Sequence, residues 1–425
     1  MQRFSVISLG CPKNLVDSEF ICERMKVHGY EQVADTLSAD IVIVNTCAFI
    51  RPAVEESIET ILEVLNEGKK VICTGCLVSR YKEELLAELP EVALFAGPGT
   101  YEYMPQYLNS GKRYLEPRFG GVVLRSSIST GASAYVKVSE GCSNHCRYCL
   151  IPRLRGELKS KPPELIEKEC IKLASIGVKE LILIAQDLGS YGRDLGDITL
   201  ETLLKQIIKI KGPEWIRLMY MHPASITKEL IEMIKDEPKI CPYLDMPIQH
   251  ISERVLRKMG RIGGKKAVDR ALELVLESNI SLRTTLMVGH PGEDDDAFKE
   301  LESLVTEGIF DHLGVFGFYP EEGTTSAGMR PRVPLAVIEE RKQQIMSIQQ
   351  EISREKLSSY RGRRLRVLLE DYADEDGFVR LGRSVFQAPD IDGVVFVNQG
   401  TATIGEFCEV EVIDSMEYDL VGRIL

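Results

Sequence analysis

The chain has 425 residues, of which 44% are hydrophobic, and its formal net charge at pH 7 is −12. Its length predicts two or three domains, and its acidic balance argues against a large electrostatic contact with nucleic acid, which attracts basic surfaces. No amino-terminal stretch is apolar for long enough to form a signal peptide or a membrane span, so we expect a cytoplasmic protein without a membrane partner.

Residues 1–115 alternate short apolar strands with helices of amphipathic spacing, which predicts a parallel α/β sheet. The expected strands are Phe4–Leu9, Asp40–Asn45, Val71–Thr74 and Val92–Ala96, and the expected helices are Asp17–His28, Pro52–Glu67 and Ser79–Leu89. Residues 111–130 are rich in Gly and Ser and have no period, so we expect a linker there, at 116–130 between the domains.

Residues 131–359 repeat the alternation six times. The expected strands are Ala134–Val138, Glu180–Ala185, Ile216–Met219, Leu244–Met246, Leu282–Val288 and Gly314–Phe318. The expected helices are Pro163–Ser175, Leu200–Lys209, Ile226–Lys235, Lys265–Glu277, Asp294–Glu307 and the long polar Leu335–Ser359. Six strand–helix units predict a partial (β/α)6 barrel, whose functional residues should lie in loops at the carboxyl ends of its strands.

Residues 360–425 differ in pattern from the rest of the chain and predict a small antiparallel β-barrel. Because the two regions before it alternate strands and helices, we expect the chain as a whole to be of the α/β class. The expected strands are Arg364–Glu370, Phe378–Gly382, Val394–Val397 and Phe407–Ile413. From Arg361 to Leu425 there are 7 Arg and no Lys against 13 Asp and Glu, including Asp374 and Glu375, a balance of 7 − 13 = −6. An acidic barrel would attract a basic protein and repel RNA, although it could also be only a solvated surface.

A CxxxCxxC triplet, Cys142, Cys146 and Cys149, directly follows the first expected strand of the second region. Three thiolates on one loop can ligate three irons of a [4Fe–4S] cluster and leave the fourth iron open to bind a small molecule. The spacing differs from the CxxC pairs of structural zinc sites, although incidental or zinc-binding cysteines remain the alternative. We expect His145 inside the loop to be exposed rather than a ligand.

Three further cysteines, Cys11, Cys47 and Cys76, each follow an expected strand of the first region. Because the carboxyl ends of parallel strands meet at one edge of a sheet, these thiols could meet and hold a second cluster with an open iron. Gly10 and Gly75 would let the backbone approach closely. The alternatives are ordinary buried small residues, or a zinc or dithiol site.

The three regions and both cysteine sets resemble the radical S-adenosylmethionine (SAM) methylthiotransferases. Members of that family have an N-terminal domain with three cysteines, a radical SAM partial barrel and a C-terminal TRAM domain, and the resemblance spans essentially the whole chain. It implies two [4Fe–4S] clusters and SAM as cofactors. The implied metal ligands are Cys11, Cys47 and Cys76 for the auxiliary cluster, and Cys142, Cys146 and Cys149, which would also be catalytic, for the cluster that binds SAM.

One branch of this family modifies an adenosine of tRNA, and the other, RimO-type branch modifies an aspartate of the small-subunit ribosomal protein S-twelve. In the stretch Ser8–Glu19, Pro-Lys follows the cysteine, which is similar to the ribosomal-protein branch, whereas the tRNA branch typically has Gln-Met there. Tyr243–Ser252 and Ala388–Gly393 are also similar to the RimO-type branch. A tRNA adenosine methylthiotransferase (MiaB-type) is the alternative, and it would predict a basic tail.

The resemblance implies that a methylthio group is added at the β-carbon of the target aspartate. Proton transfer to an acid or base cannot activate that C–H bond, so a 5′-deoxyadenosyl radical formed from SAM would abstract the hydrogen atom. The auxiliary cluster would hold the sulfur. A reductant such as flavodoxin or ferredoxin and a source of sulfide are implied as partners. No direct recognition of nucleic acid is expected.

The implied SAM contacts lie at the ends of predicted strands. Gln186 and Asp187 could bind the amino group, Gln249 could meet the ribose, and the Gly-rich stretch with Gly289 and Glu293 could lie near the adenine. For each of them, loop capping or packing is the alternative.

Two arginines and one further cysteine leave other possibilities open. Arg153 and Arg155 beside the triplet could bind a carboxylate through bidentate hydrogen bonds, or form a structural salt bridge. A non-catalytic iron–sulfur electron carrier, or a zinc-stabilised RNA-binding module that uses Cys73 and Cys76 as a CxxC pair, are the alternatives outside the methylthiotransferases.

Overall fold

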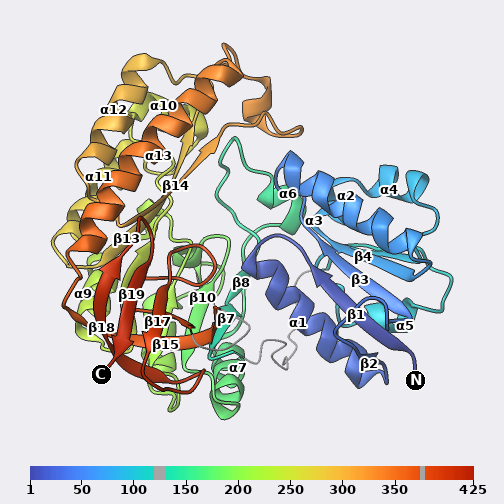
Figure 1. Ribbon diagram of the computed structural model, residues 1–425. Coiled ribbons are helices and arrows are strands. Elements are labelled where there is room, and N and C mark those ends of the chain that lie inside the picture. The colour runs from blue at the N-terminus through green and yellow to red at the C-terminus, as the bar shows by residue number, and fades with distance from the viewer. Residues whose placement is uncertain (119–130, 374–378) are drawn as a thin grey trace.

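The computed structural model describes residues 1–118, 131–373 and 379–425. These residues form a first α/β sheet with its helices, a second larger α/β sheet, and a β-barrel packed against the second sheet (Figure 1). Most of the expected linker at 116–130, and both Asp374 and Glu375, lie outside the described residues. Within them, no helix has the length and apolar composition needed to cross a membrane.

The first sheet has six parallel strands in the order β2-β1-β3-β4-β5-β6. They are β1 (Arg3–Ser8), β2 (Glu31–Gln32), β3 (Ile41–Thr46), β4 (Lys70–Gly75), β5 (Leu94–Ala96) and β6 (Tyr114–Leu115). The helices are α1 (Pro12–Val27), α2 (Arg51–Asn66), α3 (Cys76–Arg80), α4 (Lys82–Glu88) and α5 (Met104–Tyr107). The central strand β3 is buried at every position, because helices cover both faces of the sheet.

Two details of this sheet differ from the sequence-based expectation. β6 was not expected: it lies at the start of the Gly- and Ser-rich stretch 111–130, just before the linker expected at 116–130, and it pairs with β5 at the edge of the sheet. The expected helix Ser79–Leu89 is two helices, because Tyr81 between them has φ −128° and ψ 35° and so leaves the helical conformation.

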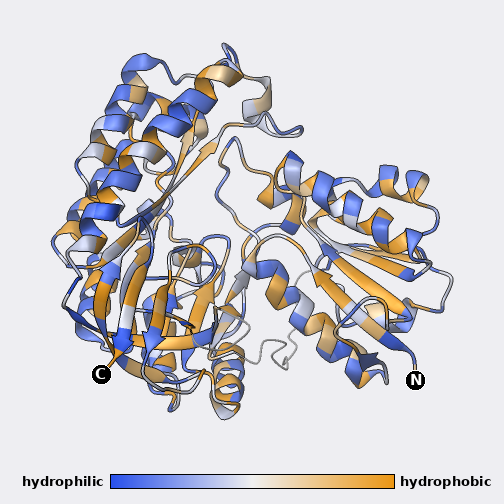
Figure 2. Ribbon diagram, viewed as in Figure 1, coloured by the Kyte–Doolittle hydropathy of each residue, from blue (hydrophilic) through white to orange (hydrophobic). Residues whose placement is uncertain are grey.

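The second sheet confirms the six expected parallel strands, in the order β14-β13-β12-β11-β10-β7. They are β7 (Ser133–Lys137), β10 (Glu180–Ile184), β11 (Trp215–Leu218), β12 (Ile240–Asp245), β13 (Ser281–Val288) and β14 (His312–Gly317), and the short pair β8 (Ser139–Glu140) and β9 (Lys159–Ser160) follows β7. The helices are α6 (Ile151–Arg155), α7 (Pro163–Ser175), α8 (Leu200–Ile207), α9 (Lys228–Asp236), α10 (Glu253–Met259), α11 (Gly264–Leu276), α12 (Asp295–Thr306) and α13 (Leu335–Ser358). Figure 2 shows mostly hydrophobic strands and helices of mixed character around them, as expected for amphipathic helices that pack on a buried sheet.

The C-terminal part is a closed barrel with the strand order β15-β16-β17-β19-β18. Its strands are β15 (Arg364–Tyr372), β16 (Arg380–Arg383), β17 (Val395–Gln399), β18 (Phe407–Ser415) and β19 (Leu420–Ile424). β19 was not expected from the sequence, and it pairs parallel with β17, whereas the other pairings are antiparallel. β19 closes the barrel, because it pairs with β17 on one side and β18 on the other and leaves neither as a free edge.

A buried ion-pair network joins this barrel to the second sheet. Glu180, the first residue of β10, pairs with Arg217 of β11 at 2.7 Å and with Arg383 of β16 at 2.5 Å. Burial alone would raise the pKa of Glu180, but the two guanidinium groups outweigh it and lower the pKa to about 2. The barrel is therefore fixed at the amino-terminal ends of the strands, opposite the edge at which functional loops of such sheets lie.

Candidate functional site

Cys142, Cys146 and Cys149 lie together in the loop that follows β8, beyond the carboxyl end of β7. All three side chains are half-buried. The backbone N–H of Asn144 donates to Cys142 Sγ at 3.4 Å, and that of Ile151 donates to Cys149 Sγ at 3.5 Å. N–H groups aimed at sulfur stabilise thiolates, so the loop is built to hold anionic sulfur.

Burial favours the neutral form of two of these thiols, against the effect of the N–H donors. Burial raises the pKa of Cys142 to about 11 and that of Cys149 to about 12, and the neighbouring thiols of the triplet add to both shifts. A thiolate is the form that ligates iron, so a bound metal would have to displace the protons. His145 is exposed, as expected.

Cys11, Cys47 and Cys76 meet at the carboxyl edge of the first sheet. Cys11 precedes α1, Cys47 follows β3 and Cys76 begins α3. Burial raises the pKa of Cys47 to about 11, and the charges of Cys76 and Cys11 contribute to that shift. The three thiols are therefore electrostatic neighbours.

Two glycines make this close approach possible. Gly10 has φ +84°, and a Cβ at that position would lie 2.6 Å from Cys47 Cβ and 2.9 Å from Cys47 Sγ. Gly75 has φ +98°, and a Cβ there would lie 2.4 Å from the carbonyl oxygen of Thr46. Both positions require a residue without a side chain, which agrees with the expectation from the sequence.

Within the described residues, no group of three or more His, Cys, Asp or Glu side chains is arranged to hold a single metal ion. A [4Fe–4S] cluster makes a different demand, because each thiolate binds a different iron atom. Three thiols therefore need not converge on one point to hold such a cluster.

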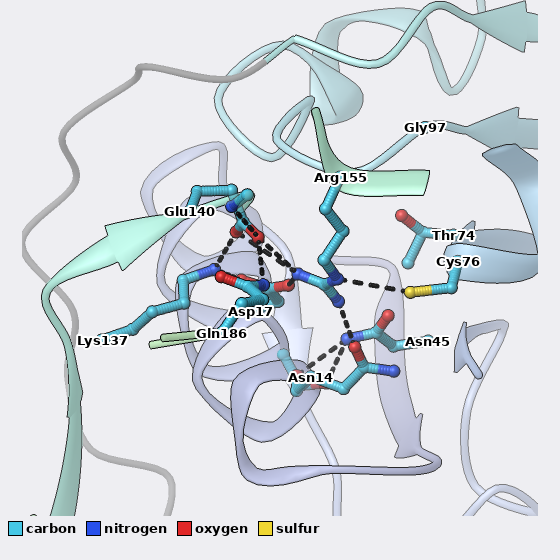
Figure 3. Close-up of polar contacts among 12 residues, drawn as sticks. Asn14, Asp17, Asn45, Thr74, Cys76, Gly97, Lys137, Glu140, Arg155 and Gln186 are labelled. Atoms are coloured by element: carbon cyan, nitrogen blue, oxygen red, sulfur yellow. Dashed lines mark hydrogen bonds and ion pairs between the residues drawn. The ribbon is translucent and has the colours of Figure 1, made fainter. Parts of the chain in front are cut away.

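Arg155, the last residue of α6, reaches from the helix that follows the triplet to Cys76 of the other cysteine set, and Figure 3 shows its contacts with Cys76 and the neighbouring polar residues. Its Nε donates to Cys76 Sγ at 3.3 Å, and its Nη1 donates to Asp17 at 3.0 Å and to Glu140 at 3.1 Å. Its Nη2 donates to Asn14. The side chain is only 2% exposed and all its nitrogens are engaged, so Arg155 forms the structural ion pair that was the alternative to carboxylate binding.

Arg153 is also engaged, because its Nη1 donates to the carbonyl oxygen of Gly323 at 3.0 Å. Since this contact is exposed and neutral, Arg153 could exchange it for another acceptor.

Lys137 and Gln186 complete the network around Glu140. Lys137, on β7, pairs with Glu140 at 2.6 Å and also with Asp17, and Gln186 Nε2 donates to Glu140 at 2.8 Å. Burial would raise the pKa of Glu140, but Lys137 and Arg155 outweigh it and hold the pKa well below its ordinary value. Two cations and two carboxylates thus balance one another in a buried junction between α1, β7 and α6.

The predicted SAM-contact residues all lie at the carboxyl edge of the second sheet. Asp187, after β10, accepts hydrogen bonds from the Asn144 amide and the Ser190 hydroxyl, both at 2.6 Å, and so it ties the cysteine loop to the sheet. Gln186 Oε1 is buried and has no hydrogen-bond partner among the described residues. Gln249, after β12, has the left-handed φ of +70°.

The Gly-rich turn after β13 is held by Glu293. Glu293 Oε1 accepts a hydrogen bond from the Gly289 backbone N–H at 2.9 Å and from Arg341 at 2.6 Å. A Cβ on Gly289 would lie 2.3 Å from the Ile338 side chain, so α13 packs directly against this turn. Both contacts are those of a packed, capped turn, the alternative to a nucleoside contact.

Four charged residues at the site were not expected from the sequence: Asp17, Lys137, Glu140 and Arg261. Arg261 Nη1 lies 3.9 Å from Cys146 Sγ, and its Nη2 donates to the Pro247 carbonyl at 2.5 Å. The sequence did contain one sign of this network: Lys137 is the only charged residue of the mostly apolar, buried strand β7. A charge in such a strand has to have a partner.

Cys73, the rival zinc ligand beside Cys76, is fully buried in the apolar core of the first sheet. Burial raises its pKa to about 12. It therefore behaves as a small core residue.

Models of three protein families match the chain. The uncharacterized protein family UPF0004 matches residues 3–97, the Radical SAM superfamily matches residues 136–305, and the TRAM domain matches residues 362–425. The first match contains one cysteine set, and the second match contains the other.

Three relatives that are all named RimO match 99% or more of this chain. The ribosomal protein uS12 methylthiotransferase RimO of Geobacter sulfurreducens is 42% identical, over 100% of this chain and 99% of its own length. The RimO proteins of an Anaeromyxobacter species and of Aquifex aeolicus are 45% and 42% identical, over 93% and 97% of their lengths.

Solved structures share the fold at low sequence identity. The radical S-adenosylmethionine methyltransferase TsrM of Kitasatospora setae matches with a TM-score of 0.58 and 16% identity, over 77% of each chain. The cobalamin-dependent S-adenosylmethionine radical enzyme OxsB matches with a TM-score of 0.53 and 12% identity, over 82% of this chain and 56% of its own.

Proposed function

The chain belongs to the RimO family of ribosomal protein uS12 methylthiotransferases, and we propose that it adds a methylthio group to the β-carbon of an aspartate of uS12. In this proposal residues 1–115 are the methylthiotransferase domain, residues 131–359 the radical SAM domain and residues 360–425 the TRAM domain. A ribosomal substrate would place the reaction in the cytoplasm.

One observation carries the proposal: α6 joins the two cysteine sets. Cys149 lies two residues before this helix begins, and Arg155 at its end contacts Cys76 Sγ at 3.3 Å. Leu150 and Leu154 pack into the core of the first sheet. A reaction that makes a radical at one cysteine set and transfers sulfur from the other needs both sets at one cavity, and this rigid connection supports that requirement.

The side chains of both sets fit two [4Fe–4S] clusters. Each set offers three thiols, and backbone or guanidinium N–H groups donate to sulfurs of both sets. When bound, the clusters and SAM would supply a hydrogen-abstracting radical and a transferable sulfur. Cys142, Cys146 and Cys149 would hold the SAM-binding cluster, and Cys11, Cys47 and Cys76 would hold the auxiliary one.

Side chains at the carboxyl edge of the second sheet would bind SAM. Gln186 Oε1 is a buried acceptor without a partner among the described residues, and an ammonium group of a ligand would satisfy it. Asp187 would act mainly by fixing the cysteine loop through Asn144. Gln249 would contact the nucleoside, whereas Gly289 and Glu293 would act by holding the turn after β13 in place.

The acidic barrel suits a basic ribosomal protein as the partner. Some of its carboxylates are neutralised by arginines, such as Glu411 by Arg423 at 2.7 Å, but Glu409 is exposed on β18 and no described residue forms an ion pair with it. Such carboxylates would attract a cationic protein and repel tRNA phosphates. A reductant such as flavodoxin or ferredoxin and a source of sulfide complete the proposed partners.

The test is mass spectrometry of anaerobic reactions that contain reconstituted enzyme, SAM, sulfide and a reductant. One reaction contains uS12 and another contains tRNA. A methylthio mass gain on an aspartate of uS12 alone is the expected result. A gain on tRNA alone would replace the substrate assignment, and no gain on either would remove the proposed function.

A further inference from the structure

Lys13 is a buried cation, and no carboxylate within the described residues is paired with its ammonium. Its side chain is 8% exposed, and its Nζ lies 3.0 Å from the centroid of the Tyr220 ring. Among residues 1–118, 131–373 and 379–425, none forms a hydrogen bond or ion pair with it. The face of one aromatic ring compensates only part of the cost of taking an ammonium out of water.

The nearby carboxylates are engaged elsewhere. Asp245 pairs with Arg283 at 3.2 Å and accepts the Tyr220 backbone N–H at 3.0 Å. Glu140 is shared by Lys137, Arg155 and Gln186. The other buried cations of this junction, Lys137 and Arg155, each have a carboxylate partner. Lys13 does not, and its ammonium can therefore donate hydrogen bonds to a bound anion.

Its position indicates which anion that is. Lys13 follows Cys11 by two residues on the first turn of α1, and its ammonium reaches Tyr220, just beyond the end of β11 in the second sheet. It therefore bridges the auxiliary cysteine set and the strand ends where a substrate would meet the radical. The carboxylate of SAM would be held at the other cysteine set.

We propose that Lys13 binds the carboxylate of the target aspartate and so selects an acidic side chain as the acceptor of the methylthio group. This inference rests on the proposed function and adds a residue for substrate recognition. The β-carbon of aspartate is bonded directly to its carboxylate carbon, so a group that fixes the carboxylate also fixes the C–H bond that has to react.

The experiment measures the dissociation constant of the reconstituted holoenzyme for uS12 and for uS12 whose target aspartate is changed to asparagine. The readout is the ratio of the two constants within one enzyme, which is independent of any general loss of binding. The enzymes are the native chain, Lys13→Met, Lys13→Gln and Lys13→Arg. Lys112→Met is the matched control, because Lys112 also lies over a tyrosine ring, 4.9 Å from the centroid of Tyr107, but is exposed.

For the native enzyme and for Lys112→Met, the asparagine protein should bind about 10- to 100-fold more weakly, the range expected for a charge-assisted hydrogen bond. For Lys13→Met and Lys13→Gln the ratio should fall to about 1, because losing the ammonium of Lys13 and losing the carboxylate of the target aspartate remove the same contact. Lys13→Arg keeps the charge and should retain most of the discrimination.

A native ratio in both neutral variants would overturn the inference, even if those variants lose iron, because Lys13 would then serve the fold or the cluster. A ratio of 1 in the native enzyme would overturn it as well. These outcomes are separate from a failure of the proposed function, in which the native enzyme would not methylthiolate uS12 at all.

Discussion

Gly10→Ala should selectively damage the auxiliary cysteine site. The new Cβ would lie 2.6 Å from Cys47 Cβ, whereas carbon atoms in contact prefer about 3.5–4.0 Å, so Cys47 has to move by roughly 1 Å. Metal–ligand distances tolerate only about 0.2 Å, so the displaced thiol should no longer ligate iron. The left-handed φ of +84° adds strain of about 1–2 kcal/mol.

Gly29→Ala is the control that separates strain from displacement. Gly29 has nearly the same φ, +85°, at the other end of α1, but no atom lies within 4 Å of the position that a Cβ would take there. The two substitutions should therefore share the strain of about 1–2 kcal/mol, while only the first displaces a cysteine.

The assay combines iron analysis with two activity measurements after anaerobic reconstitution. Two [4Fe–4S] clusters hold about eight irons, and Gly10→Ala should retain about four. It should still cleave SAM reductively but should no longer methylthiolate uS12, whereas Gly29→Ala should keep full iron and both activities. Full iron and full methylthiolation in Gly10→Ala would refute the assignment of Cys47 as a ligand, and equal losses in both variants would refute the role of displacement.

Three other sets of substitutions test separate parts of the structure. Cys146→Ala should abolish SAM cleavage, measured by chromatography of 5′-deoxyadenosine. Cys47→Ala should keep SAM cleavage but stop methylthiolation, measured by mass spectrometry of uS12. Surviving cleavage in Cys146→Ala, or methylthiolated uS12 from Cys47→Ala, would contradict the assigned ligand sets. The pKa of Glu180 is lowered to about 2 from 4.5, so its stabilising effect is complete above pH 4.5 and is lost as the pH falls towards 2. Glu180→Gln should therefore lower the urea midpoint at pH 7 and flatten its decline below pH 4.5, and an unchanged acid slope would show that other groups cause it. Glu409→Lys should weaken uS12 binding more at low salt than at high salt, and a loss independent of salt would exclude the electrostatic attraction.

The architecture was largely predictable because its signals are local. Alternating apolar strands and amphipathic helices follow the periodicity of side-chain burial, and parallel strands bring residues after each strand to one edge. This logic placed Cys11, Cys47 and Cys76 together although they are far apart in the chain. It also gave the close approach at Gly10 and Gly75.

The network between the cysteine sets was not predictable in the same way. Asp17, Lys137 and Arg155 are joined by contacts between residues 120 and 138 positions apart, and no periodicity reports such pairs. Arg155 had two open interpretations, and only its burial among Asp17, Glu140 and Cys76 decides for the structural one. β19 was missed because its five residues show no clear strand pattern of their own. Its position is fixed by its pairing with β17 and β18.

The closure of the barrel by β19 has a consequence for the order of events during synthesis. Glu180 emerges from the ribosome 203 residues before its partner Arg383, and β19 follows both. A nascent second sheet therefore exposes a carboxylate with one of its two arginines missing, and β17 and β18 remain open edges until β19 is made. A stalled or truncated translation product that ends before Leu420 should be a substrate for chaperones or proteases even though both cysteine sets are already present.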